Sequence, residues 1–287
     1  MKMLSFGEIL WDVYPDGKAI GGACLNLAAH AALLGGEVYL ASAVGCDELG
    51  REALETVRSL KISDAFIETL SDKETGAVIV TLNDRGVPSY NIKDDVAYDF
   101  ISEKGIDSQR FDVLVFGTLS LRHDFNKSSL SKLMERCSFS EIYTDLNIRL
   151  PHSTKDSAEF CLSNSTIVKI SDEEMPTVSK WIFSKEYSIE DFAIALSRKY
   201  PNIKTVIITM GERGSMAFEA QSKVFYCSNP VPTNVVSTVG AGDSFGAAFL
   251  TKLFSGKSIQ DCLDFASKLS SFVCSEKAAV PDISRFV

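Results

Sequence analysis

The amino-acid sequence predicts one three-layer α/β domain, in which helices cover both faces of a mostly parallel sheet and a small second sheet stands beside it. Short apolar runs rich in β-branched residues alternate with longer helical stretches along most of the chain, as in parallel sheets with helical crossovers. Residues 62–98 instead alternate polar and apolar positions, as expected for strands buried on one face only. No repeat, low-complexity tract or linker interrupts the 287 residues, so we expect a single domain over 1–287.

The composition fits a packed globular protein with reduced cysteines. Apolar residues make up 45% of the chain and charged residues 23%, which is ordinary for such proteins. The formal net charge of -9 argues against nucleic acid and anionic membranes as partners. Seven cysteines, an odd number without a CxxC pair, predict free thiols instead of disulfides or a zinc site. No signal-like or membrane-spanning apolar segment is evident, so we expect a cytoplasmic location.

The chain opens with a predicted buried strand over residues 3–9 and an edge hairpin that turns at Pro-Asp-Gly. Asp12 stands among the aromatic residues of this hairpin. A carboxylate there can accept hydrogen bonds from two vicinal hydroxyl groups, although a solvated strand aspartate would give the same pattern.

A helix of small residues then begins after Gly21-Gly22 and ends at Gly35-Gly36. Asn26 lies near its first turn, where the amide could bind a hydroxyl group or cap the helix. We expect His30 to be packed or half-exposed and not a ligand.

The next segments predict a strand over 38–44, a helix that Asp47 caps, and a more polar region beyond it. Residues 76–81 and 87–92 flank a turn at 83–86, which predicts a hairpin. These strands are too polar on one side to be central in a parallel sheet. We therefore expect residues 11–20 and 62–98 to form the small second sheet.

After residue 98 the α/β alternation resumes. A strand over 113–117 leads into residues 118–123 at its carboxyl end, where open α/β sheets bind their ligands. The remaining predicted strands cover 141–145, 166–170 and 203–209, and the predicted helices lie near 124–137, 153–163 and 188–199.

The stretch from Thr238 to Gly246 has the clearest chemical pattern. The extended run 231–236 precedes it and an apolar run follows, which predicts a strand, a glycine turn and a helix. Asp243 falls in the first helical turn, where it could take a proton from a hydroxyl that attacks phosphorus. A plain helix N-terminus with a favourable acidic residue is the alternative. An anion such as phosphate could bind the N–H groups of Gly240, Ala241 and Gly242.

VGAGDSF in this stretch resembles the C-terminal signature DTxGAGDxF of the ribokinase-like (PfkB) sugar kinases, and GGACLN resembles their N-terminal GGxxxN. The resemblance extends over essentially the whole chain, and GEILWDVYPDG and GTLSLR look most like bacterial fructokinases. It implies a ribokinase-like three-layer α/β/α domain with a small β-sheet lid over the sugar. No GxGxxG follows a strand, and GKS at 256–258 lacks the upstream glycine of a P-loop.

The resemblance also implies roles for residues at matching positions. Asp243 would be the catalytic base, and residues 240–242 would form the anion hole. Glu174 would organise magnesium through water. The sugar would be bound by Asp12, Gly22 and Asn26, and the phosphates and nucleotide by Arg149, Lys169, Thr209, Gly211, Gly214 and Ser267.

The expected reaction is ATP-dependent transfer of the γ-phosphoryl group to a hydroxymethyl group of a ketohexose, converting fructose to fructose 6-phosphate with Mg²⁺. Another small sugar (2-keto-3-deoxygluconate, ribose or a nucleoside) is the alternative acceptor, and Arg85 and Lys93 are the lid cations that could suit a sugar acid. A catalytically weak sugar-binding regulator is a further alternative, because the sequence departs from the family pattern at Ser237, Ser171 and Ser267. Ser237 replaces the aspartate that opens the family's C-terminal signature, so the sequence leaves open whether potassium activates the protein. The lid could also join two copies in a homodimer.

Overall fold

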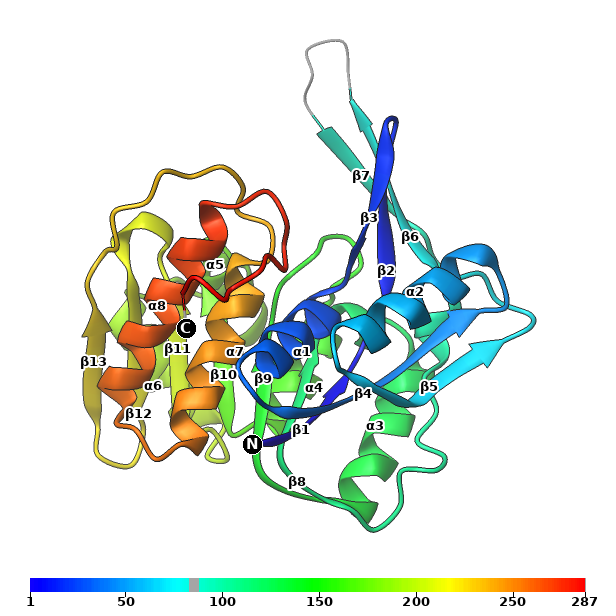
Figure 1. Cartoon of the computed structure of the whole chain (residues 1–287). Coiled ribbons are helices and arrows are strands. Elements are labelled where there is room, and N and C mark those ends of the chain that lie inside the picture. The colour runs from blue at the N-terminus through cyan, green and yellow to red at the C-terminus, as the bar shows by residue number, and fades with distance from the viewer. Residues whose placement is uncertain (83–87, 287) are drawn as a thin grey trace.

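A computed structural model describes residues 1–82 and 88–286 (Figure 1). The larger of its two sheets is built from the strands β1 (Lys2–Phe6), β4 (Glu37–Gly45), β5 (Ser63–Leu70), β8 (Arg110–Gly117), β9 (Ser138–Asp145), β10 (Ile167–Ser171), β11 (Thr205–Thr209), β12 (Ser215–Glu219) and β13 (Val224–Ser228). Within the described residues, these nine strands lie in the order β13-β12-β11-β10-β9-β8-β1-β4-β5. All neighbours from β11 to β5 pair in parallel, and β12 and β13 add antiparallel at one edge. The predicted, mostly parallel sheet is confirmed.

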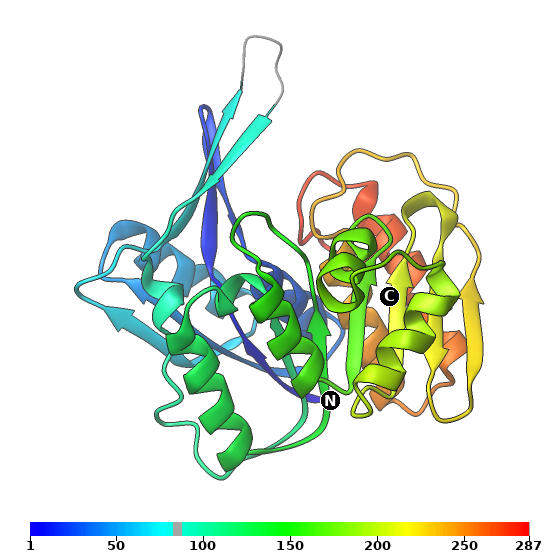
Figure 2. The ribbon, with the colours of Figure 1, turned by 180° about the vertical axis from the view of Figure 1, so that it is seen from behind.

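Helices cover both faces of this sheet, as Figures 1 and 2 show from opposite sides. One apolar core lies under α1 (Ala23–Leu33), α2 (Glu48–Ser59), α7 (Ala241–Phe254) and α8 (Ile259–Cys274). The other core lies under α3 (Asp124–Arg136), α4 (Lys155–Asn164), α5 (Met175–Phe183) and α6 (Ile189–Lys199). The three predicted helices near 124–137, 153–163 and 188–199 correspond to α3, α4 and α6. Parallel strands need this cover on both faces because their side chains are apolar in both directions.

The strand order predicts a ligand site at the carboxyl ends of the central strands. From β1 the chain moves outward through β4 to β5, and then crosses back to β8 on the other side of β1. Such a reversal opens a crevice at the carboxyl ends of the strands on either side of it. The segments that follow β1, β8 and β9 therefore meet in one place. Three short 3₁₀ helices, η1 (Ala97–Phe100), η2 (Leu119–Leu121) and η3 (Gly211–Arg213), lie in the described connections.

The small sheet projects from the large domain (Figure 1) and has the order β3-β2-β6-β7. Its strands are β2 (Leu10–Tyr14), β3 (Gly17–Gly21), β6 (Gly76–Leu82) and β7 (Pro88–Ile92). Both predicted hairpin pairings are present, with β2 antiparallel to β3 and β6 antiparallel to β7. The predicted turn at 83–86, with Arg85, lies outside the described residues.

Two of the predicted segments differ from the structure. The range 62–98 is too wide for the small sheet, because β5 pairs in parallel with β4 at the edge of the large sheet. No residue of β5 is fully buried, so its sequence alternates polar and apolar positions as that of a lid strand would. The predicted strand at 231–236 is an irregular loop with Val235 59% and Val236 52% exposed, because β-branched residues form a strand only where a neighbouring strand pairs with them.

The sequence prediction also missed β12, β13 and α5. The two strands form an antiparallel hairpin on the edge strand β11, where a period-2 pattern would have been the usable signal. Among the described residues, no helix is both long and apolar enough to cross a bilayer.

Candidate active site

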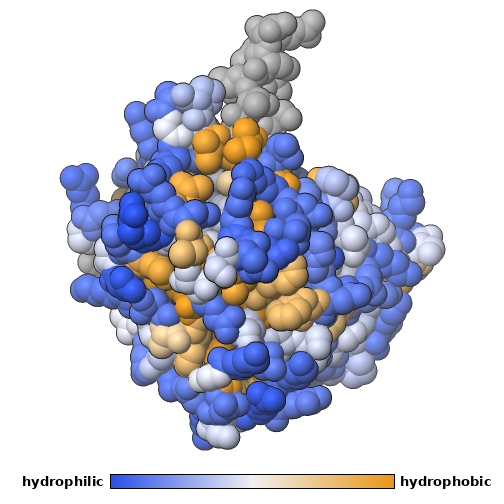
Figure 3. All heavy atoms as spheres, turned by 90° about the vertical axis from the view of Figure 1, so that its right-hand side faces the viewer, coloured by the Kyte–Doolittle hydropathy of each residue, from blue (hydrophilic) through white to orange (hydrophobic). Residues whose placement is uncertain are grey.

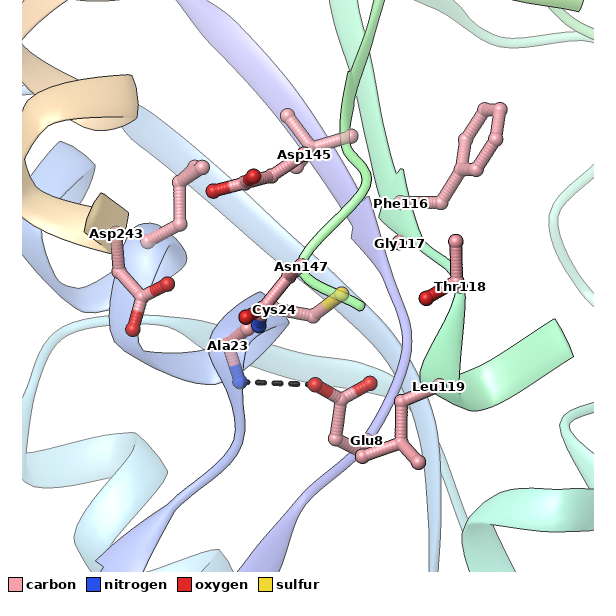
Figure 4. Close-up of a pocket in the computed structure, with 12 residues that line it drawn as sticks. Glu8, Ala23, Cys24, Phe116, Gly117, Thr118, Leu119, Asp145, Asn147 and Asp243 are labelled. Atoms are coloured by element: carbon pink, nitrogen blue, oxygen red, sulfur yellow. Dashed lines mark hydrogen bonds between the residues drawn. The ribbon is translucent and has the colours of Figure 1, made fainter. Parts of the chain in front are cut away.

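The candidate site lies where the carboxyl ends of β1, β8 and β9 meet the first turns of α1 and α7. Figure 4 shows a pocket there, lined by residues of α1, α7, β8 and β9 and by Glu8, which follows β1. Its polar lining comes from residues far apart in the sequence: Glu8, Thr118, Asp145, Asn147 and Asp243. The strand reversal at β1 thus gathers titratable groups from the whole length of the chain.

Asp243 is held at the first turn of α7, as predicted. The amide Nδ2 of Asn26, from the first turn of α1, donates a hydrogen bond to Asp243 Oδ2 over 2.9 Å. Enclosure of the carboxyl group by protein raises the pKa of Asp243 to about 7, against the lowering effect of the Asn26 hydrogen bond and of Lys169. A carboxylate with a pKa near neutrality can accept a proton and still be deprotonated in much of the enzyme, which is what a general base requires.

The predicted anion hole forms the N-terminus of α7. Gly240 is the N-cap residue, with φ of 79°, and a Cβ on it would lie 2.4 Å from the carbonyl oxygen of Ala279. The first N–H groups of a helix have no intrahelical acceptor, so those of Gly242 and Asp243 can bind an anion. The prediction for Ala241 is wrong, because its N–H donates to the Thr238 carbonyl oxygen over 3.3 Å. A Cβ on Gly242 would lie 3.1 Å from Lys169 Nζ. Only glycine lets this turn approach both neighbours so closely.

Lys169 lies directly beside this turn and is paired with Asp145. Its Nζ is 2.6 Å from Asp145 Oδ2, and both side chains are nearly buried. Burial lowers the pKa of Lys169, but Asp145 and the other carboxylates more than offset this and raise it above its usual value. The ammonium group therefore stays charged next to the anion hole.

The alternation predicted for Asp145, Asn147 and Arg149 is not present, because β9 ends at Asp145 and Asn147 has φ of 40°. Asp145 and Asn147 still line the same pocket, since the chain turns there. Arg149 is exposed, and burial raises the pKa of both Glu8 and Asp12, an effect that the positive charge of Arg149 partly offsets.

Asp12 and Gly22 lie at the base of the small sheet, next to α1. Asp12 pairs with Ala19 across the β2–β3 hairpin, and burial raises the pKa of its half-buried carboxyl group. Gly22 is the N-cap of α1, with φ of 113°, and a Cβ there would lie 2.4 Å from the Glu8 carbonyl oxygen. Asp12, Gly22 and Asn26 thus belong to neighbouring parts of one site.

Glu8 is a pocket residue that the sequence analysis did not select. It is 2% exposed, and its Oε1 accepts a hydrogen bond from the N–H of Ala23 over 2.8 Å, drawn as a dashed line in Figure 4. Its Oε2 has no hydrogen-bond partner among the residues that the structure describes, and burial raises the pKa of the carboxyl group. A glutamate directly after an apolar strand, as at position 8, is the sequence signal that could have identified it.

The residues expected near the nucleotide follow β10 and β11 on the same edge of the sheet. Gly211 and Gly214 form the turn after Thr209, with φ of 55° and 89°. The hydroxyl of Ser267 lies 2.7 Å from that of Ser228 and 3.3 Å from that of Ser215. This places Ser267 in a serine cluster between α8 and the β12–β13 hairpin.

Glu174 joins two loops at the site through its carboxylate. Oε1 accepts a hydrogen bond from the N–H of Ile148 over 2.6 Å, and Oε2 accepts one from the N–H of Ser171 over 2.9 Å. Each oxygen keeps a second lone pair for a water molecule. This geometry suits a contact to a metal ion through water.

A second cluster of titratable side chains near the base of the small sheet could geometrically surround a cation. It consists of Asp94, Asp99 and His123. Arg122 already occupies it, however. Its guanidinium donates to both oxygens of Asp99, over 2.7 and 2.6 Å, and lies 3.5 Å from Asp94. The buried positive charge makes this group an ion-pair network.

The fold and the site thus place a carboxylate, that of Asp243, beside a helix N-terminus that can bind phosphate, an arrangement suited to phosphoryl transfer. Residues 15–284 match the family described as pfkB family carbohydrate kinase. The chain therefore belongs to the pfkB family of carbohydrate kinases, and it is a phosphotransferase that acts on a sugar hydroxyl group.

Relatives with known names agree with this family. The chain is 27% identical to a probable fructokinase-4 of Arabidopsis thaliana, covering 97% of this chain and 92% of that protein. It is 26% identical to fructokinase-2 of Solanum lycopersicum over the same shares. Among solved structures, the fructokinase of Vibrio cholerae O395 with fructose, ADP and calcium ion bound has a TM-score of 0.83 at 21% identity, covering 98% of this chain and 95% of that one. Aminoimidazole riboside kinase from Salmonella enterica, at 19% identity, also has a TM-score of 0.83, covering 98% and 96%. The ribokinase-like fold is thereby confirmed.

Proposed function

We propose that the protein transfers the γ-phosphoryl group of ATP to a hydroxymethyl group of fructose and releases fructose 6-phosphate and ADP. The observation that carries the proposal is Asp243, which Asn26 holds beside the α7 N-terminus with a pKa of about 7. The names of the plant relatives and the fructose in the Vibrio cholerae structure support fructose as the acceptor.

In the proposed mechanism, Asp243 accepts the proton of the attacking hydroxyl as the oxygen bonds to the γ-phosphorus. The N–H groups at Gly242 and Asp243 and the charged Lys169 stabilise the negative charge of the phosphoryl group in transfer. Asp12 and Asn26 orient the sugar, and Arg149, near Asp12, contacts the phosphate. Asp243 and Asp145 in the pocket lining, with Asn26 bonded to Asp243 and Lys169 paired with Asp145, support these roles.

The nucleotide-side residues are proposed to hold ATP, with the adenine near Ser267 and the phosphates near the turn of Gly211 and Gly214. When bound, Mg²⁺ would supply positive charge that offsets the negative charge of the phosphates during transfer. The carboxylate of Glu174, whose two oxygens each accept a backbone hydrogen bond, would contact such an ion through water. This agrees with the preference of Mg²⁺ to keep several water ligands.

The small sheet is proposed to act as a lid of the single domain, with β2 carrying Asp12 at its base. Closure over the sugar would exclude water, which otherwise competes as phosphoryl acceptor. Figure 3 shows apolar side chains among polar ones below this sheet, a surface that a second copy of the chain could cover. Light scattering at several protein concentrations tests the homodimer. We also propose a cytoplasmic location, because all seven cysteines are free.

Potassium activation is proposed to be weak. The hydroxyl of Ser237 accepts a hydrogen bond from the N–H of Val239 over 3.2 Å, where a family carboxylate would add negative charge. Turnover measured in sodium, potassium and tetramethylammonium buffers tests this. An increase of more than about tenfold with potassium would contradict the proposal.

The test of function is ADP release with ATP and Mg²⁺ against fructose, glucose, ribose, 2-keto-3-deoxygluconate and adenosine. Turnover with fructose at the highest kcat/KM supports the proposal. A preference for another acceptor would change the proposed substrate and leave the proposed mechanism in place. No turnover, with sugar binding retained in calorimetry, would favour a sugar-binding regulator. Asp243→Ala is the matched control, since an enzyme loses turnover in this variant and still binds sugar.

A further inference from the structure

His30 is a buried titratable residue that the proposed chemistry does not use. It lies on α1 one turn after Asn26, so the two side chains extend from the same face of the helix. His30 is 0% exposed, and its Nε2 lies 2.9 Å from the carbonyl oxygen of Ala279, 249 residues away in the chain. Its side chain therefore links the helix that carries Asn26 to the C-terminal segment.

The carbonyl that His30 contacts also lies against the anion hole. The position of a Cβ on Gly240 would be 2.4 Å from the Ala279 oxygen and 2.9 Å from the Ala279 Cα. Gly240 caps α7, and Asp243 lies in the first turn of that helix. Ala279 is thus held between His30 on one side and the turn of the anion hole on the other.

The partner of His30 determines where its proton lies. A carbonyl oxygen can only accept, so Nε2 must carry the hydrogen. The other nitrogen, Nδ1, has no hydrogen-bond partner in the described part of the chain. A second proton would place an unpaired charged N–H group in a buried position, and burial lowers the pKa of His30. The ring is therefore neutral at neutral pH.

We propose that His30, neutral and protonated at Nε2, is a positioning residue for phosphoryl transfer. Through Asn26, helix α1 orients the carboxylate of Asp243, and through His30 it fixes Ala279 against Gly240. One helix thereby holds both the carboxylate of Asp243 and the segment that packs against the Gly240 turn. The inference rests on the proposed function for the reaction, but the protonation of the ring does not depend on it.

The kinetic test compares two variants at this position. His30→Gln keeps an N–H donor at a similar distance from α1, whereas His30→Leu keeps much of the volume without a donor. We expect His30→Leu to lower kcat at least about tenfold, with the KM for the sugar changed less than about threefold, because small displacements of reacting groups slow chemistry strongly. His30→Gln should recover most of kcat. Equal losses in both variants, or full activity in His30→Leu, would overturn the proposal.

A second test needs no turnover and covers the case in which His30→Leu does not fold. The sequence has only three histidines, so ¹⁵N spectra of the imidazole rings can be assigned with His30→Gln. We expect the His30 ring to keep the neutral Nε2–H form from about pH 8 down to about pH 6, near the ordinary histidine pKa. An Nδ1–H form, or titration in that range, would overturn the proposal. If no sugar supports turnover in the unaltered protein, the proposed function fails while this test still decides on the ring.

Discussion

At the scale of the residue, the proposed chemistry depends on the carboxylate of Asp243. Asn26 donates to it, Lys169 lies nearby, and enclosure by protein raises its pKa to about 7. The sequence placed Asp243 in a first helical turn, but it could not supply this environment. The environment comes from residues more than 70 positions away, on α1 and β10.

Asp243→Asn keeps the shape of the side chain and removes its ability to accept a proton. We expect kcat to fall by a factor of about 10² to 10⁴, the usual contribution of a general base. The KM for the sugar should change little, because the Asn26 amide still finds an oxygen acceptor. Steady-state ADP release measures this, with the surface variant Asp107→Asn as control. A variant with more than about a tenth of the original kcat would show that Asp243 is not the base.

The pH dependence of the reaction reports the same group. Because the base must be deprotonated, kcat/KM should rise with pH along a limb with an apparent pKa of about 7. The hydrogen bond from Asn26 lowers the pKa of Asp243, so Asn26→Ala should shift this limb to higher pH. Initial rates from about pH 5 to pH 9 measure it. A limb that stays in place in Asn26→Ala would contradict this account.

At the scale of the element, the N-termini of α1 and α7 position the site, and each begins at a glycine with positive φ. Gly22 approaches the Glu8 carbonyl, and Gly240 approaches Ala279. The sequence predicted both helix starts from the glycines. The reason for the glycines at these two positions is the contact with a distant segment.

Gly240→Ala tests that contact. Left-handed backbone in a non-glycine residue costs roughly 1–2 kcal/mol by itself, and here the added Cβ would also meet the Ala279 oxygen at 2.4 Å. We expect kcat to fall more than about tenfold as the anion hole shifts. Gly35→Ala is the matched control, since its φ is also positive, 87°, and nothing lies within 4 Å of the added Cβ. It should lose only the backbone cost, seen in urea unfolding, and keep its kcat. Equal kcat in the two variants would refute the role of the contact.

Glu8 anchors the start of α1. Glu8→Ala leaves the N–H of Ala23 without its acceptor at a partly buried position, which should lower the free energy of unfolding by about 1–3 kcal/mol. Glu8→Gln keeps an oxygen acceptor in the same place, so its loss should be under about 1 kcal/mol. Urea unfolding at pH 7 compares the three proteins. If both variants lose the same amount, the hydrogen bond to Ala23 is not the source of the stability.

At the scale of the whole molecule, the pH dependence of the free energy of unfolding should reflect the cost of burying the carboxylate of Asp243. The pKa of Asp243 is about 7 in the folded protein, against about 3.9 for an aspartate in an unfolded chain. Between these values the folded state holds a proton that the unfolded state has lost. Stability from this group is therefore fully present below about pH 4 and is lost as the pH rises through about 7.

Asp243→Asn should therefore be more stable than the unaltered protein at pH 8, by about 1–3 kcal/mol, and no more stable at pH 4. Thermal unfolding at both pH values measures the difference, and Asp107→Asn is again the control. A variant less stable at pH 8 would show that the buried charge is compensated by its neighbours. We therefore expect Asp243→Asn to be more stable at pH 8 although it loses turnover.

The sequence by itself determined the fold class, the helices α3, α4 and α6, the two hairpin pairings of the small sheet and the helix starts at Gly22 and Gly240. These features depend on local periodicity and turn residues, which a linear pattern records. It did not determine that β5 joins the large sheet or that residues 231–236 form a loop, since strand pairing depends on neighbours that a single segment does not contain.

Only the tertiary structure decided how the site is assembled. It showed that Asn26 donates to Asp243, that Lys169 pairs with Asp145 beside the anion hole, and that Glu8 lines the pocket. The strand reversal at β1 brings these groups together from the two ends of the chain and from its middle. Their pKa values and contacts are properties of that arrangement, because burial and charge pairing arise only when the separate segments pack against one another.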